Sequence, residues 1–157
     1  MLDELRQLLE ADEGVRHDVY LDHLGKRTTG VGHLIVKDDP EFTWPVGEKV
    51  SEERVTELFE QDTRIALSDA RWLQPDLDSW PVDAQITVVS LCFQLGRSRY
   101  SGFVKHHKAL EQEHWMVAAA ELRDSKLYRQ TPERTERHAK RLEGLAPIKT
   151  PHSAIVS

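Results

Sequence analysis

Two carboxylates and one hydroxyl stand close together near the N-terminus of this sequence. Glu13 is followed after eight residues by Asp22, and Asp22 is followed after five residues by Thr28. Paired carboxylates can cleave a glycosidic bond, because one protonates the leaving oxygen and the other acts on the opposite face of the sugar. Their environments must differ, so that Glu13 holds a proton as general acid and Asp22 stays ionised. Position alone favours an ordinary surface glutamate at a helix end for Glu13.

The flanking residues predict the elements that position these groups. The leucines before Glu13 recur at helical spacing, so a short amphipathic helix is expected to end at Gly14. Glu13 is then the last helical side chain, where the helix dipole disfavours a carboxylate. Val19–Leu21 and Thr28–Val31 are expected to form short strands, joined by a turn near Leu24-Gly25-Lys26. A helix end that faces a hairpin can bring the three polar groups to one point.

Six motifs, in this order, resemble those of the phage-type lysozymes. They are Asp12-Glu13-Gly14, Tyr20-x-Asp22, Thr28-x-Gly30-x-Gly32-His33-Leu34, Phe93-Gln94-Leu95-Gly96, Ser101-Gly102-Phe103 and Tyr128-Arg129-Gln130-Thr131-Pro132. Each motif alone is weak, but the ordered set is specific and extends over roughly residues 2–142.

The resemblance implies a lysozyme-like α+β fold and hydrolysis of the β-1,4 bond between N-acetylmuramic acid and N-acetylglucosamine. Glu13 would be the general acid, and Asp22 with Thr28 would hold the attacking water, so that the anomeric configuration inverts. The substrate would be the peptidoglycan glycan strand, and no cofactor or metal is implied. Positions along the substrate cleft are matched by Gly30, Leu34, Phe93 and Gln94. Gly30 has the alternative role of shaping the turn, and Phe93 that of packing in the core.

A long helix is expected to follow the hairpin. Ser51 is a candidate N-cap, and the helix would run to about Trp72 with a buried stripe that includes Ile65. Asp62 falls inside this stripe, where a carboxylate needs a partner. The resemblance supplies His33 as that partner; the alternative is a solvated Asp62 at the rim.

The C-terminal half predicts a helical lobe. Residues 82–95 form the most apolar helix, and residues 103–112 and 115–124 form two shorter ones. Thr131-Pro132 is expected to start the last helix, with Thr131 as N-cap. The segment 35–49 is shorter than in T4-type members, so their short helix there is expected to be missing or reduced.

These elements predict one predominantly α-helical domain over residues 1–157 with two lobes. The expected parts are an N-terminal helix (1–13) that packs with the helical lobe, a hairpin lobe (14–50), a connecting helix (51–72), the helical lobe (73–142) and a tail (143–157). Cys92 lies in an apolar run and is expected to be a buried small hydrophobe without a disulfide partner.

The formal net charge of −6 is unevenly distributed. Residues 1–104 carry 11 basic and 20 acidic side chains, whereas residues 105–149 carry 10 basic and 7 acidic ones. A net negative charge argues against nucleic acid as a partner, and only the C-terminal lobe is expected to attract an anionic cell wall. The acidic start and the lack of a long apolar run predict cytoplasmic synthesis in the host cell without membrane insertion. The protein would then need a separate holin to reach peptidoglycan. It is expected to be a monomer.

Three other functions agree less well with the sequence than hydrolysis does. A lytic transglycosylase needs only the acid, so Asp22 and Thr28 argue against it. A catalytically silent wall-binding module is disfavoured because the catalytic triple is complete. A zinc amidase needs several convergent ligands, and His106-His107 is expected to lie on a solvated helix face. His106 and Glu121 replace small polar residues that contact substrate in T4-type members, which leaves fine specificity open; Leu127 replaces a tryptophan and is expected to change only packing.

Overall fold

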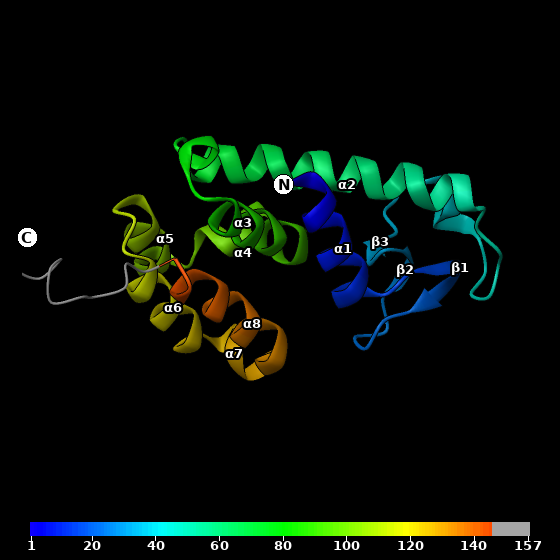
Figure 1. The fold of residues 1–157 in the computed structure, drawn as a ribbon. Helices are drawn as coiled ribbons and strands as arrows, with labels where there is room; N and C mark the ends of the chain where they lie inside the picture. The colour runs from blue at the N-terminus through cyan, green and yellow to red at the C-terminus, as the bar shows by residue number, and fades with distance from the viewer. Residues whose placement is uncertain (146–157) are drawn as a thin grey trace, which may run out of the picture.

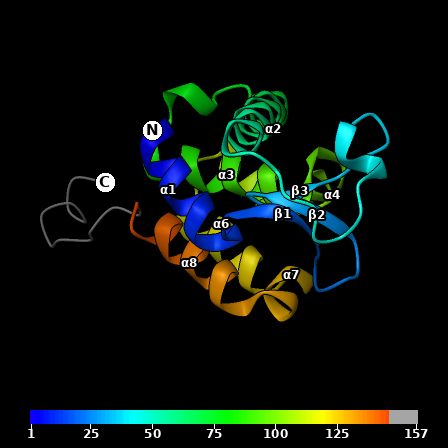
Figure 2. The ribbon, with the colours of Figure 1, turned by 90° about the vertical axis from the view of Figure 1, so that its right-hand side faces the viewer.

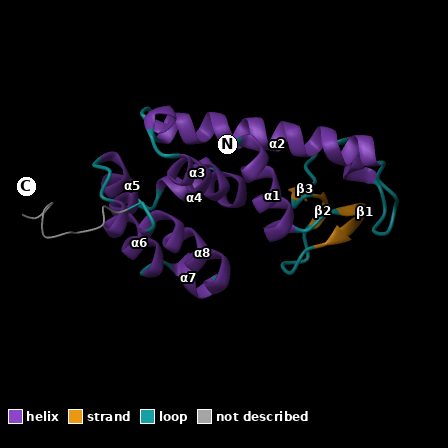
Figure 3. Cartoon of the chain, viewed as in Figure 1, coloured by secondary structure: helices purple, strands orange, loops and turns teal. Residues whose placement is uncertain are grey.

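The computed structural model of this chain describes residues 1–145 and is mostly helical, with one small sheet. Helix α2 (Glu52–Leu73) runs along the molecule, with the sheet near one of its ends and most of the other helices near the other (Figure 1). The strands are confined to that one end (Figure 3). This arrangement confirms the predicted lysozyme-like α+β fold. The predicted tail lies outside the described residues from residue 146 onward.

Helix α1 (Leu2–Glu13) ends where the sequence predicts. Gly14 has a φ of 75°, which favours glycine, and its backbone N–H donates to the Glu10 carbonyl. Leu5 and Leu9 are fully buried and join the main core with helix α3. The N-terminal helix therefore packs with the helical lobe, although the sheet follows it in sequence.

The sheet has three antiparallel strands in the order β1 (Arg16–Leu21), β2 (Arg27–Gly30) and β3 (His33–Leu34). The predicted two-stranded hairpin was therefore incomplete. Strand β3 has two residues, which is too short for a period of two to be visible in the sequence. Its pairing places Leu34 opposite Thr28 and His33 opposite Thr29.

The loop after the sheet is held by a small second core and by ion pairs. The short helix expected to be missing or reduced is a single 3₁₀ turn, η1 (Pro40–Thr43). Glu41 in this turn is almost completely buried and binds Arg54 of helix α2 at 2.5 Å. The core below the loop consists of Val19, Ile35, Val50 and Val55.

Helix α2 starts as predicted, because the Ser51 hydroxyl accepts a hydrogen bond from the Arg54 backbone N–H. Val55, Leu58, Phe59 and Ala66 of its stripe are buried. Ile65 is 53% exposed, so its predicted burial was wrong. At 100° per residue it falls at the edge of the stripe and not at its centre.

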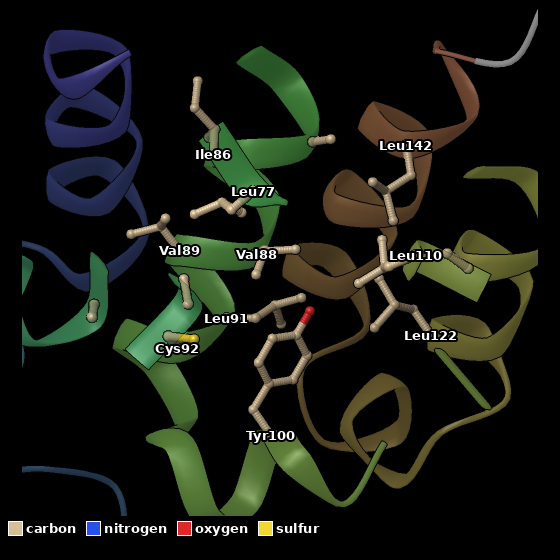
Figure 4. Close-up of a cluster of buried hydrophobic side chains, with 14 of the residues drawn as sticks. Leu77, Ile86, Val88, Val89, Leu91, Cys92, Tyr100, Leu110, Leu122 and Leu142 are labelled. Atoms are coloured by element: carbon tan, nitrogen blue, oxygen red, sulfur yellow. The ribbon is translucent and has the colours of Figure 1, made fainter. Parts of the chain in front are cut away.

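Helix α3 (Val82–Leu95) has the predicted bounds and lies in the middle of the helical lobe. Its apolar side chains fill the space between helix α1 and the C-terminal helices (Figure 4). Cys92 is buried there as a free thiol, as predicted, and burial raises its pKa to about 12. The short 3₁₀ helix η2 (Leu77–Ser79) precedes helix α3 and contributes the fully buried Leu77.

Three of the remaining helices match predicted ones, and two were not predicted. Helices α5 (Val104–Glu111), α6 (Trp115–Arg123) and α8 (Pro132–Glu143) agree with the sequence. Helices α4 (Arg97–Ser101) and α7 (Lys126–Gln130) have five residues each, too few for an amphipathic pattern. Thr131 is the N-cap residue of helix α8, as predicted, but its side chain makes no capping hydrogen bond; its hydroxyl donates to the Leu127 carbonyl.

Helix α2 is seen end-on in Figure 2, with the end of the molecule that carries the sheet turned toward the viewer. Within residues 1–145, no helix is both long and apolar enough to cross a membrane.

Candidate active site

The carboxylate of Glu13 lies at the end of helix α1, directly against the turn between strands β2 and β3. A Cβ atom on Gly32 would come within 2.5 Å of Glu13 Oε2 and 2.9 Å of its Cδ. Gly32 also has a φ of 61°, a conformation that favours glycine. The side chain of Glu13 is 20% exposed. The glycine therefore provides the space in which the carboxylate sits.

Arg134 of helix α8 holds the end of helix α1. Its Nη1 donates a 2.7 Å hydrogen bond to Glu13 Oε1, and its Nε lies 3.3 Å from Asp12 Oδ2, an ionic contact without hydrogen-bond geometry. Arg137 donates a 2.6 Å hydrogen bond to the other Asp12 oxygen. Two arginines thus offset two carboxylates at the negative end of the helix dipole.

The sequence reasoning missed this arginine cluster. A signal was present, because helix α1 ends in Asp12-Glu13 and has no basic residue in its last turn. Such an end needs cations from elsewhere, and Arg134 and Arg137 are three residues apart, on one face of helix α8.

Asp22 and Thr28 are brought together by the backbone of Lys26. Asp22 Oδ1 accepts hydrogen bonds from the Leu24 and Lys26 backbone N–H groups, at 2.9 and 2.8 Å. The Thr28 hydroxyl donates to the Lys26 carbonyl at 3.0 Å. The backbone hydrogen bond from Lys26, with a further one from Leu24, lowers the pKa of Asp22 although partial burial opposes the shift. Asp22 is therefore ionised at neutral pH.

The charges of both Glu13 and Asp22 act on the side chain of Tyr20. It is directly opposite Thr28 in the sheet, and the Arg16 guanidinium lies over its ring at 4.3 Å from the centroid. Burial raises the pKa of the Tyr20 phenol, and the negative charges of Glu13 and Asp22 add to the rise while Arg16 opposes it. Both carboxylates thus act on a single side chain of strand β1.

The predicted substrate positions Gly30 and Leu34 differ in their surroundings. Leu34 is 46% exposed and lies opposite Thr28, so its side chain is accessible beside the candidate catalytic residues. A Cβ atom on Gly30 would meet Val55 of helix α2 at 3.4 Å, and its φ is 62°. Both observations explain the glycine by turn shape and packing; contact with sugar remains a prediction.

Phe93 and Gln94 lie at the C-terminal end of helix α3. Phe93 is half-buried and packs edge-on against Phe59, with 5.9 Å between the ring centroids. The side-chain oxygen of Gln94 is buried without a hydrogen-bond partner among residues 1–145. An unpaired buried amide oxygen is free to accept a hydrogen bond from a ligand. A substrate role remains a prediction for both residues.

Residues 10–146 match the family described as phage lysozyme. The chain belongs to the phage lysozyme family. It is 30% identical to the probable T4-type lysozyme 2 of Dictyostelium discoideum, over 87% of this chain and 92% of that protein. It is 28% identical to the peptidoglycan hydrolase gp36 of Pseudomonas phage phiKMV, over 87% of this chain but 15% of that protein. It is also 27% identical to the pre-baseplate central spike protein Gp5 of Enterobacteria phage T4, over 85% of this chain and 26% of that protein.

His33 and Asp62, which the family resemblance pairs, are joined in the structure. His33 Nδ1 lies 2.6 Å from Asp62 Oδ2. The sequence reasoning missed a second carboxylate: Asp39 Oδ2 lies 2.8 Å from the other ring nitrogen of His33. Asp39 lies in the loop after the sheet, where no periodic pattern identifies a side chain that turns inward.

The expectation that His106 and His107 lie on a solvated face was wrong. His106 is 2% exposed; its Nδ1 donates to the Ala118 carbonyl, and its Nε2 accepts from the Tyr100 hydroxyl at 2.7 Å. His107 Nε2 donates to the Tyr100 carbonyl and Nδ1 accepts from Gln74. Adjacent residues on a helix do point apart, but helix α5 is covered on both sides.

A hollow of about 490 Å³ lies in the helical lobe, next to His106 and Glu121. Leu127 also lines it and is 2% exposed, in agreement with a packing role. The hollow is lined by none of the three candidate catalytic residues. In the described part of the chain, no three His, Cys, Asp or Glu side chains form a group that could hold a metal ion.

Proposed function

We propose that this chain is an endolysin that hydrolyses the β-1,4 bond between N-acetylmuramic acid and N-acetylglucosamine in peptidoglycan. Membership of the phage lysozyme family supports hydrolysis of peptidoglycan. The observation that carries the proposal is the pair of differently held carboxylates: Glu13 in the space above Gly32, and Asp22 fixed to the Lys26 backbone beside Thr28.

Glu13 is the general acid in this proposal. It delivers a proton to the glycosidic oxygen as the bond to the anomeric carbon breaks. Arg134 fixes the carboxyl group through Oε1, which leaves Oε2, the oxygen next to Gly32, to face the leaving oxygen. The glycine backbone allows the sugar chain to approach this oxygen closely.

Asp22 and Thr28 hold the attacking water. Asp22 uses Oδ1 for both backbone hydrogen bonds, so Oδ2 is free to accept one water proton. The Thr28 hydroxyl donates its only proton to Lys26, so its oxygen can accept the other water proton. With both protons held, a lone pair of the water points away toward the anomeric carbon. As the water attacks from the face opposite the leaving group, its proton passes to Asp22 Oδ2 and the configuration at the anomeric carbon inverts.

The biological setting belongs to the same proposal. The enzyme acts as a monomer on the glycan strands of the cell wall, after synthesis in the cytoplasm of the host and release through the inner membrane by a separate holin. Lysis of the host cell is the result.

A turbidity assay on Gram-negative cells with permeabilised outer membranes tests the activity. Glu13→Gln is expected to fold normally and to lose about 10²–10⁴-fold in lytic rate, because an amide has no labile proton to donate. Glu10→Gln is the matched control, since Glu10 lies on the same helix with an exposed side chain. Lysis by Glu13→Gln within tenfold of wild type would overturn the assignment of the acid.

Product analysis distinguishes the reaction types. NMR of the first-formed product is expected to show an inverted anomeric configuration. Retention would overturn attack by water, and a 1,6-anhydro end would identify a lytic transglycosylase. Asp22→Asn is expected to be severely impaired, because the neutral amide cannot take the proton of the attacking water as the carboxylate does.

A further inference from the structure

His33 lies between two carboxylates that come from different parts of the chain. Its Nδ1 is 2.6 Å from Asp62 of helix α2, and its Nε2 is 2.8 Å from Asp39 in the loop after strand β3. The side chains of His33 and Asp39 are 8% and 10% exposed, so solvent screens this contact weakly. The three groups thus tie together a helix, a strand and a loop.

The hydrogen bonds require that both ring nitrogens of His33 carry a proton. Ionised carboxylate oxygens only accept hydrogen bonds, so an imidazole between two of them must donate twice and is positively charged. Burial lowers the pKa of His33, but the hydrogen bonds to Asp62 and Asp39 outweigh burial and leave the pKa raised. The other charged group at this place is Arg54, whose Nη2 lies 3.8 Å from Asp39 Oδ1 and which also binds Glu41 and Glu57.

This bridge lies next to the candidate catalytic residues. Strand β3 has two residues, His33 and Leu34; His33 is paired with Thr29 and Leu34 with Thr28. Asp39 Oδ2 also accepts a hydrogen bond from the Val36 backbone N–H, so the same carboxylate also binds the backbone of the segment that follows strand β3. A two-residue strand has few backbone hydrogen bonds of its own, so its side-chain anchors contribute to holding it in place.

We propose that Asp39 is a positioning residue of the active site, which shares the charged His33 with Asp62 and thereby holds strand β3, and through it Thr28, in place. The inference rests on the proposed function for its catalytic meaning, but the bridge itself is independent of activity. When the pH rises through the folded pKa of His33, the ring keeps one proton and donates to only one carboxylate. Strand β3 then loses an anchor, and the water held by Thr28 loses its fixed position.

Asp39→Asn tests the bridge, with Asp38→Asn as the matched control. Asparagine keeps the size of the side chain and one acceptor oxygen but removes the charge. Asp38 is the preceding residue and is exposed. NMR titration of the His33 ring gives its midpoint, the pH at which half of the rings have lost the second proton. The backbone amide resonance of Thr28 reports whether Thr28 in strand β2 moves with this titration. The release of reducing ends from peptidoglycan between pH 5 and pH 10 gives kcat/KM.

The expected result is a coordinated shift. In Asp39→Asn the His33 midpoint falls by roughly one pH unit or more, because one of two nearby negative charges is lost. The pH midpoint of the Thr28 resonance and the pH at which kcat/KM falls on the alkaline side both shift down by the same amount as the His33 midpoint. Asp38→Asn leaves all three where they are in the wild type. Asp39→Glu retains the charge and is expected to recover most of the shift.

Each contrary outcome has a distinct meaning. An unchanged His33 midpoint in Asp39→Asn would show that the charge of Asp39 does not act on the ring, and would overturn the proposal. A Thr28 resonance that does not follow the His33 midpoint, in the wild type or the variant, would overturn the positioning role even if Asp39→Asn folds poorly. Absence of released reducing ends from wild type would instead refute the proposed function, because the two NMR titrations do not depend on catalysis.

Discussion

Arg134 of helix α8 donates a 2.7 Å hydrogen bond to Glu13 at the end of helix α1, across 121 residues of chain. This bond joins the first and last helices described and fixes one oxygen of the candidate general acid. The Arg134 side chain is 12% exposed, so it also places a charge in a mostly buried position. The stability of the fold and the geometry of the site therefore depend on the same contact.

Replacement of Arg134 by leucine is expected to destabilise the protein by on the order of 3 kcal/mol, because two largely buried carboxylates lose a shared cation. Lys140→Leu is the control. Lys140 is exposed on the same helix, so the expected loss is below about 1 kcal/mol. Urea unfolding at pH 7 measures both, and equal losses would show that Arg134 has no special role at the helix end.

Gly32→Ala is expected to impair lysis more than Gly25→Ala. Both glycines have positive φ values, 61° and 77°, so each substitution carries a backbone cost of about 1 kcal/mol. A Cβ atom meets nothing within 4 Å at Gly25 but would displace the Glu13 carboxylate at Gly32. Thermal melts measure the loss of stability that both variants are expected to share. Turbidity assays measure the lytic rates, which are expected to differ between them. Similar lytic rates for the two variants would contradict the close contact with Glu13.

The His33–Asp62 bond is expected to make stability depend on pH. The folded pKa of His33 is raised above 6.5, so its contribution is complete below about pH 6.5 and is lost as the pH rises through the folded value. The folded pKa of Asp39 is lowered, although burial opposes this, because Val36 and His33 donate to the carboxylate. Its contribution is present above about pH 3.9 and is lost as the pH falls through the folded value.

Asp62→Asn is therefore expected to cost most below about pH 6.5, where His33 carries both protons, on the order of 1–5 kcal/mol. The loss is expected to shrink toward pH 9, where His33 no longer carries the second proton. Thermal melts of wild type and variant from pH 3 to pH 9 provide the measurement. A difference that stays constant over this range would mean that Asp62 is solvated and that the pair contributes no charge interaction.

The buried His106 predicts the opposite response in the helical lobe. Burial lowers its pKa to about 3, against the weaker opposing effect of its hydrogen bond to Ala118. A folded pKa below the unfolded one gives stability that is complete above about pH 6.5 and is lost as the pH falls below it. The loss approaches about 1.4 kcal/mol per pH unit.

His106→Gln removes this proton uptake. The variant is less stable than wild type at pH 7, because it loses the Tyr100 contact, but the difference is expected to narrow steadily from pH 7 to pH 4. Urea unfolding at each pH measures the difference, with the exposed His17→Gln as control. A difference that widens in acid would show that His106 is not held neutral in the fold.

The sequence by itself determined the features that depend on nearby residues. Gly14 and Gly96 end helices α1 and α3, Ser51 caps helix α2, and the apolar run from Val82 fixes helix α3. The resemblance of the ordered motifs to those of the phage-type lysozymes identified Glu13, Asp22 and Thr28 as the candidate site. The helix end and the hairpin turn that carry them were predictable because they are local structures whose caps and turn residues lie within a few positions.

Only the tertiary structure decided which distant groups meet. Arg134 and Asp39 complete the surroundings of Glu13 and His33. The acidic end of helix α1 signals a need for cations, but only the fold shows that Arg134 supplies one, and no pattern marks Asp39 as a partner of His33. His106 and His107 were assigned to solvent because a single helix cannot show what packs against its polar side; helix α6 and Gln74 cover them. A charged or polar side chain is accommodated wherever the fold supplies its hydrogen bonds, and that supply comes from residues far away in the sequence.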